Sequence, residues 1–229
     1  MVFKLNKFLI LLVYFLASFY LPSEESLVVK NEYKPVVNEI IEILDQNHFK
    51  KNIVINEQKV IDNFLVNIDK EKIVFTSVEF NSYKARFKNI YNLAEIFKIY
   101  QDYSDRTLEL INYQKDVVDL IDTSADLNTT EFVEKSREDE KRFNSLDSIK
   151  NYHALLIKNE FINILLSNDN FENSKSKLLK RLKNRVKSLK RIKSDDIFSL
   201  YINSITSLYD PHTNYLSPKS QEDFEINMS

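Results

Sequence analysis

Hydrophobic residues along this chain recur at the three- and four-residue spacing that is typical of amphipathic helices. The first stripe follows Pro35, a residue suited to the first turn of a helix, and consists of Val36, Val37, Ile40, Ile41 and Leu44. The second follows Asn56, a candidate N-cap, and consists of Val60, Ile61, Phe64, Leu65 and Ile68. We therefore expect two helices early in the chain.

The next stretch combines the best strand candidate of the chain with a long helical pattern. Lys72 to Phe75, "KIVF", has the composition of a short strand, although a lone strand is hard to stabilise. Thr76 or Ser77 is then placed to cap a long helix, whose pattern continues less regularly to Ile121. Its apolar stripe consists of Phe80, Tyr83, Phe87, Tyr91, Ala94 and Phe97.

A polar interval separates this pattern from the helices that follow. Asp122 to Phe143 predicts a loop and then a solvent-exposed helix. Helical periodicity returns from Leu146 to Leu166, and the polar stretch "SNDNFENSKSK" interrupts it. No repeat of about 20 to 50 residues is visible, so the pattern does not indicate a solenoid.

A strongly basic segment runs from Lys175 to Lys193. Its apolar stripe consists of Leu178, Leu179, Leu182, Val186 and Leu189, with Lys and Arg around the rest. We interpret it first as the solvated outer face of a packed helix. The alternatives are a docking surface for an acidic partner, and a surface that binds membranes or nucleic acid.

The most regular helix begins after Ser194, a candidate cap, with Asp195 and Asp196 complementing the helix dipole. Its stripe consists of Ile197, Phe198, Tyr201, Ile202, Ile205 and Leu208. We expect it to end at Asp210, because the residue before a proline is forced out of the helical region. The Asp210 carboxylate is placed to accept backbone amides in an Asx turn.

Beyond this turn, Ser217 and Pro218 predict the start of a short helix, as a cap and an N1 proline. Tyr215 and Phe224 are expected to fold back as apolar anchors. Phe224, Ile226 and Met228 alternate as they would in a strand. We interpret that ending as a chain that continues into a further domain.

The first 21 residues differ from everything after them. Lys4 and Lys7 precede an apolar run that starts at Phe8 and ends in the small pair Ala17 and Ser18, which is the layout of a secretory signal. The run is shorter than the ~20 apolar residues of a spanning helix, so we expect cleavage and export of the remainder. The alternative is an uncleaved membrane anchor.

Composition supports a helical fold, because the chain contains no glycine. Type I′ and II′ hairpin turns, phosphate-binding loops and dinucleotide fingerprints all depend on glycine, whereas helices do not. Codon bias is an alternative cause with the same structural consequence. The expected fold class is mostly α, an irregular multi-helix domain with few or no strands, preceded by a signal peptide.

The residues offer no catalytic constellation. His48, His153 and His212 are far apart, and His153 lies in an apolar helical stretch typical of a core or boundary position. His212 beside Asp210 is better explained by a local hydrogen bond than by a general base. Cysteine is absent, and the net charge is −2. We therefore assign no catalytic, cofactor-binding or metal residues and expect no cofactor.

Residues Ser194 to Ser229, with the core "DPHTNYLSP", resemble the end of the N-terminal helical domain of tail-specific proteases, also called carboxy-terminal processing peptidases, in their periplasmic bacterial form. Two earlier stretches, "DNFLVNIDKEKIVFTSVEF" and "FKIYQDYSDRTLELI", fit more loosely. The resemblance implies a following PDZ domain that holds substrate C-termini, and a protease domain with a nucleophilic serine and a general-base lysine. Both catalytic residues would follow Ser229, so none is transferred to this chain.

On this resemblance, residues 22–209 are a helical N-terminal domain, and residues 210–229 lead towards the PDZ domain. The turn would act as a structural joint, made of Asp210, Pro211, His212, Thr213, Tyr215, Ser217 and Pro218. The module would be a non-catalytic scaffold of an exported serine endopeptidase. Its expected partners are protein substrates, reached through the other domains, and a protein adaptor; nucleic acid is not expected, and membrane contact is expected only through residues 1–21. The alternative is a stand-alone helical binding protein of the cell envelope.

Overall fold

The computed structural model describes residues 27–50, 53–122, 131–134, 136–167 and 170–217, together with Gln221 and Ile226. Within these ranges the regular elements are seven helices, and no strand is present. The helices are α2 (Tyr33–Asn47), α3 (Glu57–Ile68), α4 (Ser77–Arg86), α5 (Leu93–Leu120), α6 (Leu146–Leu166), α7 (Phe171–Leu189) and α8 (Ser194–Thr206). The expected mostly-α fold class is therefore confirmed.

Polar side chains cap most of the helix starts. The Asn56 side chain accepts the Lys59 N–H at the start of α3, as the sequence predicted. Thr76 and Glu79 form a reciprocal capping box at α4. Asn92, Ser145 and Asn170 cap α5, α6 and α7. Asn170 shows that α7 already begins inside the polar interval that was expected to interrupt the helical pattern.

The predicted strand at Lys72 to Phe75 is wrong, because these residues form a loop after α3. The Asp69 carboxylate accepts the backbone N–H groups of Ile73, Val74 and Phe75 at 3.0, 3.2 and 3.1 Å, which replaces the hydrogen bonds of a neighbouring strand. Val74 and Phe75 are buried, so the apolar pattern reported burial rather than a strand. Lys72, with φ of 58°, is the residue of the described chain that takes the left-handed conformation, and it does so without glycine.

The single long helix predicted after Thr76 is in fact two helices. α4 ends at Arg86, and Phe87 and Ile90 are buried in the connection before Asn92 starts α5. Because both residues are apolar and close to helical spacing, the stripe alone did not reveal the break.

The solvent-exposed helix predicted before Phe143 is also wrong for the described residues, since 131–134 and 136–145 are irregular. Two arginines explain why the segment is held in place. Arg142 makes an ion pair with the buried Asp69 carboxylate and donates to the Asp69 carbonyl oxygen at 3.2 Å. The Arg137 guanidinium lies 4.0 Å from the Phe143 ring centroid, and its side chain donates to the Lys141 carbonyl oxygen.

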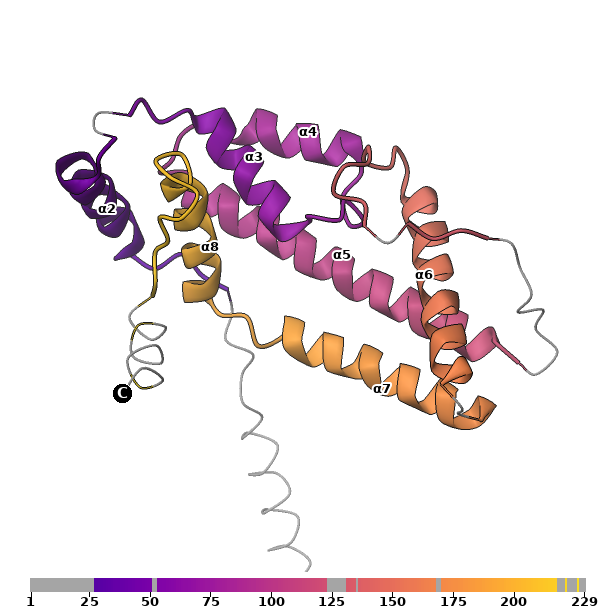
Figure 1. The fold of residues 1–229 in the computed structure, drawn as a ribbon. Coiled ribbons are helices and arrows are strands. Elements are labelled where there is room, and N and C mark those ends of the chain that lie inside the picture. The colour runs from indigo at the N-terminus through magenta and orange to yellow at the C-terminus, as the bar shows by residue number, and fades with distance from the viewer. Residues whose placement is uncertain are drawn as a thin grey trace, which may run out of the picture.

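The helices surround two hydrophobic clusters joined by α5 (Figure 1). The first cluster lies between α2, α3, α4, α5 and α8 and includes Ile149 from the start of α6; Phe64, Ile96 and Tyr201 are fully buried in it. The second lies between the C-terminal half of α5, α6 and α7, with Val118, Phe161 and Leu182 at its centre. The basic segment is thus a packed helix, and its apolar stripe faces the second cluster.

The start of α8 holds the segment that precedes α2. Ser194 was expected to cap α8, but its hydroxyl accepts the Val28 N–H at 3.0 Å, and the Asp196 carboxylate accepts the Lys193 N–H at 2.8 Å. The Asp195 carboxylate accepts from Lys30 at 2.8 Å and from the Tyr33 hydroxyl at 2.6 Å. The Tyr33 ring also stacks on Phe198. These contacts attach residues 28–33 to the start of α8. The joint described below follows the end of the same helix.

The expected signal sequence, residues 1–21, lies outside the described residues. Among the described helices, none combines the length and the apolar character that crossing a membrane requires.

Candidate functional site

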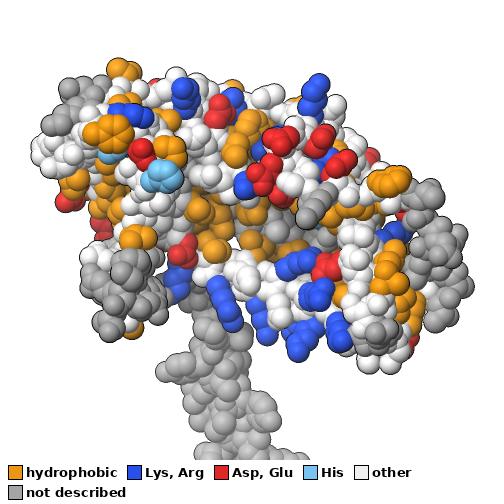
Figure 2. Space-filling view, viewed as in Figure 1, with side chains coloured by type: hydrophobic (Ala, Val, Ile, Leu, Met, Phe, Trp, Pro, Cys, Tyr) orange, Lys and Arg blue, Asp and Glu red, His pale blue; other side chains and the backbone are white. Residues whose placement is uncertain are grey.

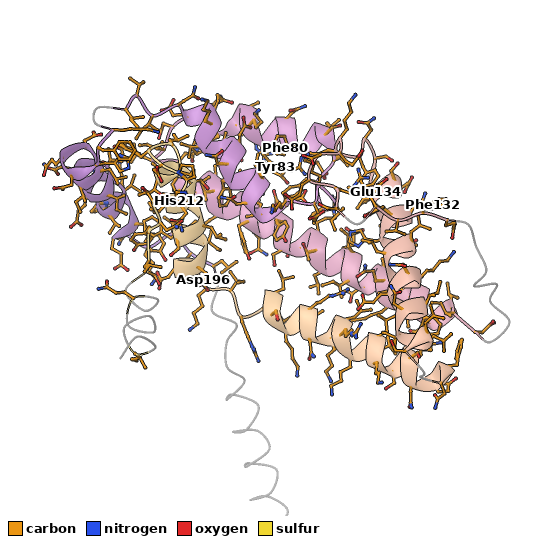
Figure 3. All side chains as sticks on the ribbon, viewed as in Figure 1. Phe80, Tyr83, Phe132, Glu134, Asp196 and His212 are labelled. Atoms are coloured by element: carbon orange, nitrogen blue, oxygen red, sulfur yellow. The ribbon has the colours of Figure 1, made fainter. Side chains whose placement is uncertain are left out.

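The candidate site is the joint at the end of α8, residues 210–218. α8 ends at Thr206, four residues before the predicted end, and Ser207 to Tyr209 continue as a turn. Figure 3 shows His212 near one end of α8 and Asp196 near the other, so the joint lies at the end of the helix opposite to the contacts of Asp195 with Lys30 and Tyr33.

The Asx turn predicted at Asp210 is confirmed. The Asp210 side-chain oxygen accepts the His212 N–H at 2.7 Å, and the Asp210 carbonyl oxygen accepts the Thr213 N–H at 3.1 Å. Pro211 occupies the position between them, where a fixed φ suits a tight turn. The turn is therefore closed by one side-chain and one backbone hydrogen bond.

Polar side chains of α8 then bind the joint back onto the helix. The Thr206 hydroxyl donates to the Thr213 carbonyl oxygen at 2.7 Å. The Asn203 side chain accepts the Tyr215 N–H at 2.7 Å and donates to the Tyr215 carbonyl oxygen at 3.4 Å. The Tyr215 ring meets Phe198 edge-on at 6.1 Å, which confirms Tyr215 as an apolar anchor. Residues 213–215 therefore run back along α8 and are held at both main chain and side chain.

Tyr209 connects the joint to α2. Its ring is fully buried, and its hydroxyl donates to the Asp45 carboxylate at 2.9 Å. Burial, and then the hydrogen bond to Asp45, raise the pKa of Tyr209 to about 12. The His48 ring meets Tyr209 edge-on, and Phe49 packs on His48. The joint thus begins directly after a contact, between Tyr209 and Asp45, that attaches the end of α8 to α2.

His212 and Ser217 complete the described part of the predicted joint. His212 is exposed, and Asp210 binds its backbone N–H, which agrees with a local structural role. Ser217 is buried, and its carbonyl oxygen accepts the Gln221 N–H at 2.9 Å, as expected where a short helix begins. Pro218 and Phe224 lie outside the described residues. Ile226 is helical, so the strand suggested for the alternating end is wrong at this residue.

Three residues that hold the joint, Asn203, Thr206 and Tyr209, were not singled out from the sequence. Asn203 and Thr206 are polar positions three residues apart near the end of α8, and this was the available signal. Asp45 gave no such signal, because only the folded chain brings α2 beside the end of α8.

The histidines and carboxylates of the described residues do not gather into a metal-ligand group. No group of three or more His, Cys, Asp or Glu side chains in them is placed to hold a metal ion. His153 is buried as predicted, its Nε2 lies 3.0 Å from the Ile73 carbonyl oxygen, and burial lowers its pKa. An imidazole held in this way is part of the packing between α6 and the loop after α3.

A groove of about 1210 Å³ opens between the two hydrophobic clusters. Tyr103 and Leu110 of α5, Asn159 of α6 and Arg185 of α7 are among the residues that line it. Figure 2 shows the face hollowed between a row of Lys and Arg side chains along its lower edge and acidic side chains above. The sequence could not reveal this groove, because its walls come from segments far apart in the chain.

The match to a family model covers most of this assembly. Residues 40–219 match the model described as "Tail specific protease N-terminal domain". The chain belongs to this family of tail-specific protease N-terminal domains. Its similarity to the tail-specific protease of Haemophilus influenzae is 27% identity over 197 residues, covering 81% of this chain and 28% of that protein. The chain therefore spans a little over a quarter of that relative, and the resemblance seen at its end extends through the helices.

Proposed function

We propose that this chain is the non-catalytic N-terminal scaffold or regulatory module of an exported serine endopeptidase that degrades proteins from their C-termini. The observation that carries the proposal is the family match, which runs from α2 through the joint. In this proposal, residues 22–209 form the helical domain, residues 210–229 lead to a PDZ domain, and a serine and a lysine of a later domain perform hydrolysis. Protein substrates reach the enzyme through those domains, and residues 1–21 direct export.

The geometry of the joint supports a mechanical role for this module. Its hydrogen bonds to Asn203 and Thr206 restrict the first residues that leave α8. Tyr209 and Asp45 fix the base of the joint to α2. A following domain would then leave the helices at a set angle, and the position of its substrate-binding surface would depend on these bonds.

The test uses the full-length protease with Asp210→Ala. We expect unchanged hydrolysis of a short peptide, because the catalytic groups are elsewhere, and slower degradation of a whole protein, because the domains are misaligned. X-ray scattering should show a broader distribution of domain separations. His212→Ala is the matched control, since the described bond to His212 uses its backbone. Loss of peptide hydrolysis with unchanged scattering would contradict the proposal.

The groove favours a second candidate, a stand-alone binding module of the cell envelope, because a lined hollow of this size can hold a partner segment. The intact mass of the endogenous protein, measured by immunoblot, separates the two. A band far above 27.2 kDa is the result expected for a protease module, and a band at or below that mass supports the binding module.

A further inference from the structure

One face of α7 carries a row of cations that point away from the rest of the molecule. We define the basic face as Lys180, Lys183, Lys187 and Arg191, the last in the turn after the helix. At 3.6 residues per turn, the three lysines fall on the side opposite Leu178 and Leu182, which are fully buried in the second cluster. All four residues of the basic face are exposed.

The cations beside this face are already engaged, whereas those on it are not. Arg181 and Arg185 make ion pairs with Glu160 at 3.1 and 2.7 Å. Lys175 donates to carbonyl oxygens at the C-terminal end of α5. Within the described ranges, the members of the basic face make no ion pair, and the α7 sequence contains no Asp or Glu after Glu172. Within the described part of the chain, no carboxylate pairs with these four charges.

This local charge is separated from the acids of the chain. The net charge is −2, so the basic face is balanced by carboxylates elsewhere. Figure 2 shows blue side chains along the lower edge of the molecule, where α7 runs, and red side chains gathered above the groove. A nearly neutral protein with separated charges is oriented by a charged surface even though its net charge does not attract it.

The chemistry of the basic face favours a lipid surface over a protein partner. Protein interfaces are depleted in lysine and depend on aromatic and arginine anchors in pockets. The three helical positions here are all lysine, and the groove lies on the Arg185 side of α7. Lysines on a straight helix suit a diffuse layer of anionic headgroups, to which each contributes independently.

We propose that the basic face of α7 adsorbs to a membrane surface that contains anionic phospholipid. The apolar side of α7 is committed to the second cluster, so adsorption is electrostatic and involves no insertion of the helix. Binding should therefore vanish at high ionic strength, where the Debye length falls to about 3 Å.

The test is cosedimentation of the mature chain, from which the expected signal sequence of residues 1–21 has been removed, with phosphatidylcholine vesicles, with and without phosphatidylglycerol, at low ionic strength. We expect binding that depends on phosphatidylglycerol. The triple variant Lys180→Glu, Lys183→Glu and Lys187→Glu should bind these vesicles more weakly. Losing each lysine should weaken binding roughly fivefold, so the total loss should be at least on the order of a hundredfold. Circular dichroism should show unchanged helicity, because the three side chains are exposed.

The matched control reverses three lysines on other elements and gives the same net charge: Lys59→Glu, Lys88→Glu and Lys115→Glu. This variant should retain most of the phosphatidylglycerol-dependent binding. Three results would each overturn the proposal: equal binding to both vesicle types, undiminished binding by the α7 variant, or equal loss in the control. A chain that ignores anionic vesicles altogether would overturn it as well.

Discussion

At the scale of single residues, Asp69 explains a loop that the sequence did not predict. Its carboxylate is almost completely buried and accepts three successive backbone N–H groups while pairing with Arg142. A buried carboxylate is stable only when it is paired and hydrogen-bonded, and here each contact satisfies that condition. One residue thus fixes the loop after α3 and the segment before α6.

Asp69→Asn should lower the free energy of unfolding by about 3–5 kcal/mol, because it leaves Arg142 buried without its counter-charge. Urea denaturation followed by circular dichroism measures this loss. As a control, Lys98→Ala removes a pair on the surface of α5 and should cost less than about 1 kcal/mol. Equal losses of unfolding free energy in the two variants would show that the buried pair contributes no more to stability than the surface pair.

His153 makes stability depend on pH. Burial depresses its pKa in the folded protein, so between its unfolded value near 6.5 and that lower value the unfolded chain binds a proton that the folded chain does not. The stabilisation by this residue is therefore complete above about pH 7 and decreases as the pH falls, by up to about 1.4 kcal/mol per pH unit.

His153→Gln should flatten this dependence while an amide remains to bond the Ile73 carbonyl oxygen. Unfolding free energies at two pH values on either side of the unfolded pKa measure the effect. A wild-type slope retained in His153→Gln would exclude this histidine as its source.

At the scale of elements, polar side chains satisfy the free N–H groups at the starts of most described helices. The capping box of Thr76 and Glu79 is the clearest case, because Arg106 on α5 also donates to Glu79 at 2.8 Å. Burial acts against ionisation of Glu79, but its bonds to Thr76 and Arg106 dominate and hold its pKa below the usual value. The start of α4 is thereby joined to α5.

Thr76→Ala should reduce the free energy of unfolding by roughly 0.5–2 kcal/mol through loss of this cap. Ser77, the other residue that the sequence offered as a cap, is half-buried, and its hydroxyl donates to the Asn144 side chain in a solvent-exposed bond instead of capping α4. Ser77→Ala should therefore cost less than Thr76→Ala, as measured by thermal or urea denaturation. A larger loss of unfolding free energy in Ser77→Ala than in Thr76→Ala would mean that Thr76 is not the cap of α4.

At the scale of the whole molecule, two hydrophobic clusters share one long helix, with the groove between them. α5 crosses from one cluster to the other, so each end of the molecule has its own packing (Figure 1). Such an arrangement permits each end to open with some independence, because the buried apolar residues fall into two separate clusters.

Leu182→Ala should cost about 2–5 kcal/mol and accelerate amide hydrogen exchange in α6 and α7 more than in α3 and α8. Leu65→Ala, the same change at an equally buried position of the first cluster, should give the reverse pattern. Uniform acceleration in both variants would mean that the two clusters unfold as one.

The sequence predicted those elements whose signals are local. The stripes of α2, α3, α6, α7 and α8, the Asn56 cap and the Asx turn at Asp210 are each specified within a few neighbouring residues, and the structure confirms them. The strand at Lys72 to Phe75 and the unbroken helix through Phe87 failed for one common reason. Apolar spacing reports which residues are buried, but not which distant group satisfies the backbone around them.

By itself, then, the sequence determined a glycine-free helical fold, its main helices and the turn at its end. Tertiary structure decided the rest: Asp69 opposite Arg142, Asn203 and Thr206 along the joint, Tyr209 against Asp45, and the groove between two clusters. Helical periodicity and turn chemistry are local properties of the chain. Buried polar partners are chosen only when packing brings distant segments together and removes water as the alternative.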